Sequence, residues 1–281
     1  MRLATVRHGG AVTAAVSTDG EWRALPAPDL SAWYSDGAPL QPGELLEQPE
    51  FATPLPAPTK VICCGLNYAD HIRETGRELP SYPTLFAKYA DTLLGPPDDI
   101  VLPAGLQLDW EAELAVVVGA TLHRADRVGA SAAIAGYTVA NDISVRDWQY
   151  RTAQWFQGKA WDDSTPVGPV VVTADEVDPR AGLTVTCLIN GEEVQHGDTA
   201  QLVFDAADLL AYVSTFTVLR PGDLVLTGTP GGVGVARDPQ RFLADGDVVE
   251  TEISGLGTLR NRVRIRTDQH HTRGSTPWTP T

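Results

Sequence analysis

Cysteine is scarce in this chain: only three occur among 281 residues. Two of them, Cys63 and Cys64, are adjacent, so the spacing suits neither a disulfide framework nor a cysteine metal site. Such sparing use of cysteine is typical of a reducing compartment. In a strand, Cys63 and Cys64 would point to opposite faces, and we expect both to pack in the interior.

Positive charge is also scarce. Lys and Arg number 21 against 36 Asp and Glu, which gives a formal net charge of −15 and a pI near 4.7. Nucleic acids and anionic membranes require clustered cations, so we expect neither as a partner. An acidic protein that binds an anionic substrate must gather its few cations at one site.

Long apolar runs are missing as well. The sequence has no run of eighteen apolar residues, and residues 1–7 contain no apolar core long enough for a signal peptide. We therefore expect a cytoplasmic protein. The 43% of hydrophobic residues still suffice for a substantial core.

Two glutamates stand one residue apart at the start of the apolar run at residues 114–118, which we interpret as a buried strand. Alternate side chains of a strand share a face, so Glu111 and Glu113 project together. At about 4 Å the two carboxylates would repel by roughly 4 kcal/mol at an effective dielectric near 20. A divalent cation relieves this repulsion. A solvated strand end is the alternative.

About thirty residues further on, Asp142, Arg146 and Gln149 follow a second apolar stretch at spacings of four and three. If a helix begins there, the three side chains form one stripe. Three carboxylates without Cys or His favour Mg²⁺ or Mn²⁺, with Ca²⁺ possible, over zinc or copper. An ordinary surface helix is the alternative interpretation of this segment.

Several ordered motifs carry a resemblance to a known family. They are G-L-N-Y-A-D-H-x-x-E at residues 65–74, E-x-E at 111–113, D-x-x-x-R-D-x-Q at 142–149, G-K at 158–159, T-P-x-G-P at 165–169 and T-G-T-P-x-G-V-G at 227–234. Together they resemble the fumarylacetoacetate hydrolase family, in particular its shorter bacterial members. The resemblance spans approximately residues 58–263.

This resemblance implies roles for individual residues. Glu111, Glu113 and Asp142 would be the metal ligands, and His71 with Glu74 would activate water on a segment that closes over the metal. Lys159 would be a catalytic cation that faces the substrate. Arg146, Gln149 and Lys159 would hold an anionic 2-oxo or diketo acid, and the Gly228 backbone and Thr229 hydroxyl would bind its carboxylate.

The leading functional hypothesis is a metal-dependent hydrolase that cleaves a C–C bond of acylpyruvates or β-diketo acids resembling acetylpyruvate or fumarylpyruvate, as in aromatic catabolism. Two other reactions would use the same enolate: decarboxylation of oxaloacetate-like acids, and isomerisation or tautomerisation of compounds such as 2-hydroxyhepta-2,4-diene-1,7-dioate. A non-catalytic metal-binding protein is a further alternative. The glycine-rich loop at 227–234 lacks the Gly-Lys-Ser/Thr of a phosphate-binding loop, which excludes a nucleotide site of that type.

The resemblance also implies the architecture: an α+β, β-rich fold, a mixed β-sandwich roll, and a homodimer. We divide the chain into a small N-terminal β domain at 1–57, a catalytic domain at 58–265 and a flexible C-terminal tail at 266–281. Asp205 is expected to cap a helix whose apolar residues belong to the core, namely Leu209, Leu210, Val213 and Phe216.

Overall fold

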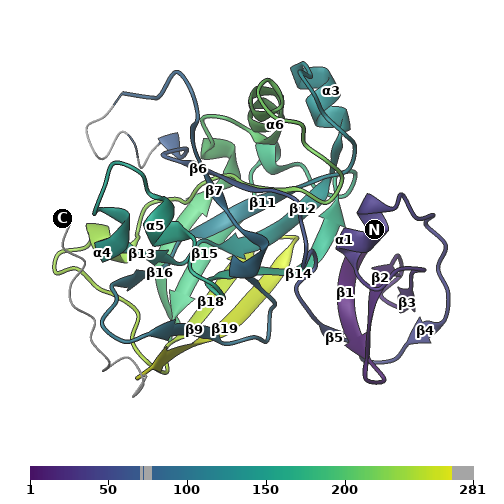
Figure 1. Ribbon diagram of the computed structural model, residues 1–281, viewed down its shortest axis with the longest axis horizontal. Coiled ribbons are helices and arrows are strands. Elements are labelled where there is room, and N and C mark those ends of the chain that lie inside the picture. The colour runs from purple at the N-terminus through teal and green to yellow at the C-terminus, as the bar shows by residue number, and fades with distance from the viewer. Residues whose placement is uncertain (70–71, 73–77, 268–281) are drawn as a thin grey trace, which may run out of the picture.

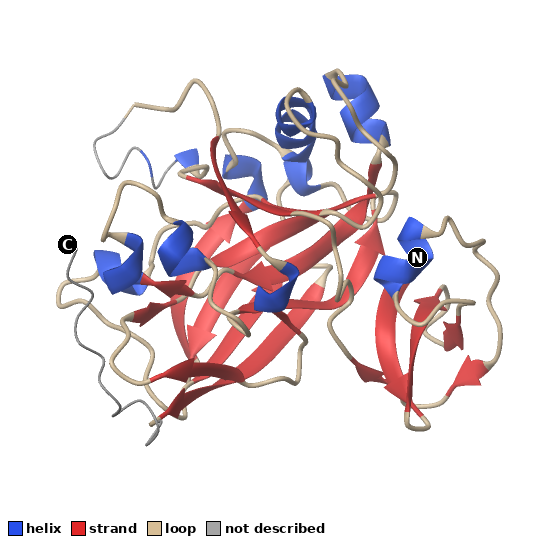
Figure 2. Cartoon of the chain, viewed as in Figure 1, coloured by secondary structure: helices blue, strands red, loops and turns tan. Residues whose placement is uncertain are grey.

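The computed structural model describes residues 1–69, 72 and 78–267. Strands form the body of the molecule and short helices lie around it (Figure 2), which confirms the β-rich α+β class. The helix predicted at 69–74, with His71 and Glu74, lies largely outside the described residues, as does nearly all of the predicted tail.

The largest sheet in the described part of the chain has twelve strands. Near its middle, β11 (Ala112–Val118) pairs antiparallel with β12 (Ile134–Asn141) on one side and with β17 (Leu224–Leu226) on the other. Beyond β12 the sheet continues with β14 (Thr165–Thr173), β1 (Arg2–His8), β2 (Ala11–Ser17), β3 (Trp22–Ala24) and β4 (Leu45–Leu46). Beyond β17 it continues with β6 (Val61–Gly65) and β7 (Thr84–Lys88). Two further strands pair at the side: β5 (Glu50–Phe51) with β1, and β8 (Leu93–Leu94) with β14.

Both faces of β11 are buried, which explains its uninterrupted apolar sequence. Leu114 and Val116 belong to one hydrophobic cluster, whereas Ala115 and Val117 belong to a second cluster on the opposite face. The buried strand predicted at residues 114–118 is confirmed. Cys63 and Cys64 divide between the same two clusters, so the prediction of buried cysteines on opposite faces is confirmed as well.

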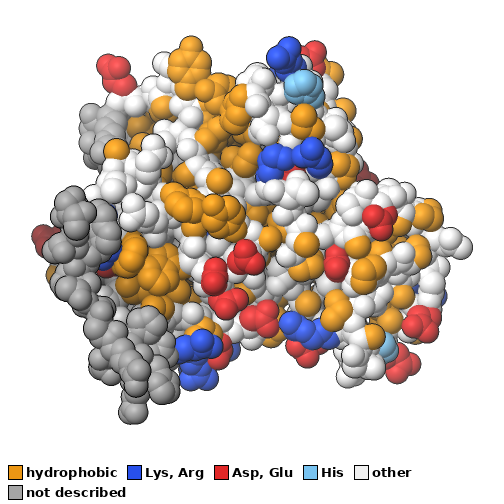
Figure 3. Space-filling view, viewed as in Figure 1, with side chains coloured by type: hydrophobic (Ala, Val, Ile, Leu, Met, Phe, Trp, Pro, Cys, Tyr) orange, Lys and Arg blue, Asp and Glu red, His pale blue; other side chains and the backbone are white. Residues whose placement is uncertain are grey.

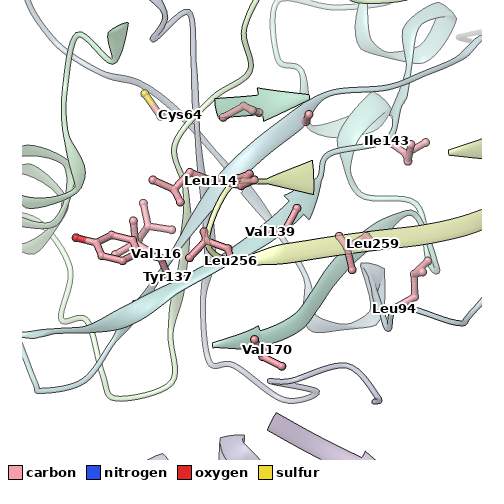
Figure 4. Packing of buried hydrophobic residues seen from close by; sticks show 14 of the residues in the cluster. Cys64, Leu94, Leu114, Val116, Tyr137, Val139, Ile143, Val170, Leu256 and Leu259 are labelled. Atoms are coloured by element: carbon pink, nitrogen blue, oxygen red, sulfur yellow. The ribbon is translucent and has the colours of Figure 1, made fainter. Parts of the chain in front are cut away.

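A five-stranded sheet packs against β11, β12 and β14 to form the sandwich. Val116, Tyr137 and Val139 of the large sheet meet Leu259 of the second sheet and Leu256, from the turn between its strands β18 and β19, in the core (Figure 4). The second sheet has the order β16 (Glu192–Asp198), β15 (Thr184–Ile189), β18 (Val248–Ile253), β19 (Gly257–Arg266) and β9 (Ile100–Pro103), and a separate pair consists of β10 (Leu108–Asp109) and β13 (Ser144–Val145).

The N-terminal strands form a lobe at one side of the molecule, coloured purple in Figure 1. The large sheet continues into this lobe, because β1 pairs with β14 through Arg2–Val172 and Leu3–Val171. The small β unit predicted at 1–57 therefore exists as strands β1–β5 and α1 (Leu30–Ser35). Its independence as a domain stays a prediction.

The longest described helix, α6 (Ala206–Ser214), begins at Asp205, whose side chain accepts from the Asp208 N–H in a capping box. Leu209 and Val213 are fully buried as predicted, but the prediction for Phe216 is wrong: it lies beyond the helix end and is 63% exposed. The other helices in the described part of the chain are α3 (Arg127–Ala132), α4 (Arg146–Gln149) and α5 (Phe156–Lys159), with 3₁₀ turns η1 (Ala90–Thr92), η2 (Pro179–Ala181), η3 (Thr199–Gln201) and η4 (Gly234–Ala236).

None of the described helices is both long and apolar enough to cross a membrane. On the face shown in Figure 3, Lys and Arg side chains occur in small separate groups between acidic and apolar ones.

Candidate active site

Three carboxylates meet at the end of the two central strands. Glu111 directly precedes β11, Glu113 lies within it, and Asp142 directly follows β12. Antiparallel pairing of Ala112 with Asn141 brings the two strand ends together, and the Asp142 N–H donates to the Glu111 carbonyl at 2.8 Å. The three side chains are buried, and one oxygen from each lies within 4.8 Å of the others. The predicted acidic cluster is therefore present.

The prediction that Asp142, Arg146 and Gln149 lie on one helix is wrong, because Asp142 is not helical. Residues 144–145 pair as β13 with β10, so the helix begins only at Arg146. The side chains nevertheless converge. The Arg146 Nη1 atom donates to Gln149 Oε1 at 2.7 Å and lies 2.7 Å from Glu111 Oε1.

Lys159 joins two of the carboxylates. Its Nζ atom donates to Glu111 Oε2 at 2.7 Å and to Asp142 Oδ2 at 2.8 Å. Burial alone would lower the pKa of Lys159, but Asp142 and Glu111 outweigh it and raise the pKa. Lys159 therefore stays charged at neutral pH and is a fixed cation.

The lysine reaches the cluster because α5 lies directly against α4. A Cβ atom at Gly158 would lie 2.4 Å from the Gln149 Cβ and 2.6 Å from its backbone nitrogen. Only glycine allows the two short helices to approach so closely. This contact explains why glycine precedes Lys159.

Arg146 forms an ion pair with Asp109, for which the sequence motifs predicted no role. The Arg146 Nε donates to Asp109 Oδ2 at 2.8 Å. Asp109 also accepts from the backbone N–H groups of Gly234 at 2.6 Å and Val235 at 2.9 Å. Burial opposes the charge of the guanidinium, but Glu111 and Asp109 raise the pKa of Arg146. The signal that would have identified Asp109 is its position two residues before Glu111, which continues the alternation of acidic residues at 109, 111 and 113.

A second lysine, Lys88, contacts the other oxygen of Asp142. Its side chain is fully buried at the end of β7. Burial tends to raise the pKa of Asp142, but Lys159 and Lys88 outweigh it, and the net effect lowers the pKa. A lysine that ends an apolar strand was the only sequence signal for this role.

Glu113 differs from the other two carboxylates in its surroundings. Within the described residues, no Lys or Arg forms an ion pair with it, and its Oε2 accepts from the Gly228 N–H at 2.8 Å. Burial, followed by repulsion from Asp142 and Glu111, raises the pKa of Glu113 well above its usual range. A divalent cation would relieve this repulsion, so the all-oxygen cluster fits a hard metal ion.

The loop at residues 227–234 lies beside the cluster. Thr229 donates its hydroxyl proton to the Ala112 carbonyl at 2.9 Å and accepts from Gln195 Nε2 at 2.8 Å. The Gly228 N–H and the Thr229 hydroxyl thus bind protein groups in this structure, and their contact with a substrate carboxylate stays a prediction.

Six of the predicted site residues line a cavity of about 360 Å³, whereas Asp142 is fully buried and is not part of its lining. Glu111, Glu113, Arg146 and Lys159 form one part of its surface. The other lining residues are Cys64, Gly65, Leu66, Phe86, Gln149, Tyr150, Trp155, Thr229, Val233, Val235 and Ala236. A larger cavity of about 780 Å³ lies beside α3 and α6, and none of the predicted site residues that the structure describes lines it, so the smaller cavity is the candidate site. The predicted pair His71 and Glu74 lies outside the described residues.

The C-terminal model of the fumarylacetoacetate (FAA) hydrolase family matches residues 60–264. The chain belongs to this family, as the sequence motifs predicted. The mitochondrial oxaloacetate tautomerase of Homo sapiens is 47% identical over 216 residues, which are 76% of this chain and 69% of that protein.

Solved structures with other activities share the fold. The 2-hydroxyhepta-2,4-diene-1,7-dioate isomerase from Mycobacterium marinum is 32% identical with a TM-score of 0.80, over 95% of this chain and 100% of that chain. Maleylpyruvate hydrolase from Sphingobium is 28% identical with a TM-score of 0.76 over the same shares. The chain is thus similar to a tautomerase, an isomerase and a hydrolase of one family.

Proposed function

We propose that this protein is a metal-dependent enzyme that enolises 2-oxo acids, with keto–enol tautomerisation of oxaloacetate-like acids as its reaction. The observation that carries the proposal is the placement of two buried cations, Arg146 and Lys159, at the Glu111 carboxylate in the wall of the cavity. Enolisation places negative charge on the keto oxygen, and preorganised cations in a buried site stabilise such charge.

Glu111, Glu113 and Asp142 would hold the divalent ion, Mg²⁺ or Mn²⁺. A bound ion of this kind supplies Lewis acidity that polarises a keto group. Lys159 contributes a positive charge beside the carboxylates, where its Nζ donates to Glu111 Oε2 at 2.7 Å and to Asp142 Oδ2 at 2.8 Å. Arg146 and Gln149 bind each other at 2.7 Å and together orient the anionic substrate.

Tautomerisation also requires a group that moves a proton between carbon and oxygen. Lys159 has another role here, because its Nζ donates to Glu111 and Asp142 as the cation of the site. We assign the proton transfer to His71 and Glu74, on the basis of the motif at residues 65–74.

Hydrolysis of acylpyruvates is the second candidate, and the similarity to maleylpyruvate hydrolase favours it. It needs the same enolate as a leaving group, together with a water molecule that attacks the distal carbonyl. His71 and Glu74 would then deprotonate this water. The two reactions therefore differ in one water-dependent step.

The proposal is tested with oxaloacetate, whose enol is followed by its ultraviolet absorbance, and with acetylpyruvate, whose products are identified by mass. We expect Mg²⁺ or Mn²⁺ to be required for accelerated enol–keto exchange. Glu113→Gln should lower the rate by about a hundredfold or more, because it removes a ligand charge. The control is Glu50→Gln, since the Glu50 side chain is 62% exposed and lies outside the cavity.

The outcomes separate the candidates. Release of acetate from acetylpyruvate without effect on oxaloacetate would replace the tautomerase with the hydrolase. No turnover of either acid, with the metal bound, would refute both.

A further inference from the structure

The indole of Trp155 forms part of the cavity surface. Trp155 and Phe86, which we call the aromatic wall, both line the cavity, with ring centroids 5.8 Å apart and planes inclined at 70°. The Lys159 Nζ lies 5.1 Å from the centroid of the Phe86 ring. The aromatic wall therefore lies next to the cation at the carboxylate cluster.

Gly65 provides the space that the indole occupies. A Cβ atom at Gly65 would lie 2.3 Å from Trp155 Cζ3 and 3.0 Å from Cη2. The backbone of Gly65 is not in the left-handed region, so any L-residue could adopt its conformation. Within the described residues, the three atoms nearest to such a Cβ all belong to Trp155, so the indole explains the glycine at this position. The indole is thus confined between the Gly65 backbone and the Phe86 ring.

Four further residues of the cavity lining are apolar, and two of them, Cys64 and Val233, are buried. Cys64 is a buried residue of β6, and Val233, Val235 and Ala236 belong to the segment that includes η4. Closely packed interiors yield little to an added group. A substrate fixed at the carboxylate cluster must therefore fit its distal group into the space that the aromatic wall leaves.

We infer that Trp155 is a specificity-determining residue that limits the size of the group attached to C3 of the 2-oxo acid. This inference rests on the proposed function. The substrate class is then 2-oxo acids with a small distal group, such as a carboxylate or an acetyl group, and aryl-substituted acids are excluded. The position of the indole sets this size limit.

The first test compares tautomerisation of oxaloacetate with that of phenylpyruvate, which carries an aromatic ring at C3. Trp155→Ala should raise the ratio of kcat/KM for phenylpyruvate to that for oxaloacetate by roughly tenfold or more, and Trp155→Phe should raise it less. The matched control is Phe156→Ala. Phe156 is the adjacent residue and is 38% exposed, packs against Tyr89 and does not line the cavity, so the ratio should stay at its wild-type value.

The second test measures the contact itself and needs no activity. Gly65→Ala should lower the urea midpoint of the wild-type protein, because its methyl group displaces the indole. In the Trp155→Ala background the same substitution should have little effect. An equal loss in both backgrounds would show that Gly65 does not position Trp155.

The two tests distinguish failure of the inference from failure of the proposed function. If the wild type turns over oxaloacetate and Trp155→Ala leaves the substrate ratio unchanged, the inference is wrong and the tautomerase stands. If the wild type turns over neither acid, the proposed function is wrong. Titration with pyruvate and phenylpyruvate then decides the inference, because Trp155→Ala must tighten phenylpyruvate binding relative to pyruvate.

Discussion

Lys88 and Lys159 contact different oxygens of Asp142, and these contacts orient the carboxylate toward Glu111. Lys159 can be associated with the site from its motif, whereas Lys88 is 54 residues from Asp142 and belongs to no motif that we recognised. Both lysines stabilise the ionised form of the buried Asp142 carboxylate, and their contacts fix its orientation. Lys88 is therefore a positioning residue for the candidate metal site.

Replacement of Lys88 by methionine keeps most of the volume of the side chain and removes its charge. We expect Lys88→Met to lower the free energy of unfolding by about 3 kcal/mol, because the buried Asp142 loses one of its partners. The rate of oxaloacetate tautomerisation should fall as well. Urea denaturation and ultraviolet assays measure the two effects.

Lys60→Met serves as the control for this experiment. The Lys60 side chain is 24% exposed and its Nζ lies 3.9 Å from Asp223 Oδ2, so its loss should cost less than about 1 kcal/mol. Equal losses of stability in the two variants, with full activity in both, would contradict the role of Lys88.

At the scale of elements, α4 and α5 are each a single short turn, and tertiary contacts hold them in place. Gly158 lies at their point of contact, where an added methyl group would overlap the backbone of Gln149. The position of Lys159 therefore depends on the packing of two helical turns as well as on its own side chain.

Gly158→Ala should separate the two turns. We expect a loss of about 1–3 kcal/mol in the free energy of unfolding, as for other overpacked sites. We also expect a lower kcat, since Lys159 is moved away from Asp142. Urea denaturation and steady-state kinetics with oxaloacetate check this prediction.

Gly129→Ala is the matched control within another short helix, α3. Its added Cβ would lie 3.3 Å from Asp126 Oδ1, the N-cap oxygen that accepts from the Gly129 N–H at 2.8 Å, so this contact is less severe than the backbone overlap at Gly158. The change should leave kcat unaltered and alter the free energy of unfolding by no more than about 1 kcal/mol, because the gain in helix propensity offsets the close contact with the cap. A Gly158→Ala enzyme as stable and active as Gly129→Ala would refute the packing argument.

At the scale of the whole molecule, the N-terminal lobe shares both a sheet and a core with the rest. Leu3 pairs with Val171 across β1 and β14, and both side chains belong to the same hydrophobic cluster as Ala115 and Val117 of β11. One face of the strand that carries Glu113 is thus covered in part by the N-terminal residues. The stability of the site and of the lobe should be coupled.

We expect Leu3→Ala to lower the stability of the entire chain by about 2–5 kcal/mol in a single unfolding transition. Tryptophan fluorescence and circular dichroism should report the same shifted midpoint. Val12→Ala, at a position of β2 that is 49% exposed, should shift the midpoint much less. Two separate transitions, of which only one responds to Leu3→Ala, would show instead that the lobe at 1–57 is an independent domain.

The homodimer inferred from the family resemblance stays a prediction at this scale. So does the choice among Mg²⁺, Mn²⁺ and Ca²⁺, because three carboxylates suit each of these hard cations.

Local patterns in the sequence determined much of the protein. The apolar run before Gly119 predicted β11, the alternation of strand side chains predicted that Glu111 and Glu113 would meet, and Asp205 predicted the start of α6. These features depend on residues within a few positions of one another. The ordered motifs added the family, and the family model confirms it.

How the distant segments combine is apparent only in the folded chain. The pairing of β10 with β13 prevents a helix at Asp142, the pairing of β1 with β14 joins the N-terminal lobe to the large sheet, and Asp109 and Lys88 contact their partners across the fold. Strand pairing and buried ion pairs depend on which segments meet in space, and no local periodicity encodes that choice. The sequence alone therefore identified the three carboxylates together with Arg146 and Lys159, while the fold added Lys88, Asp109, the contact between α4 and α5, and the aromatic wall.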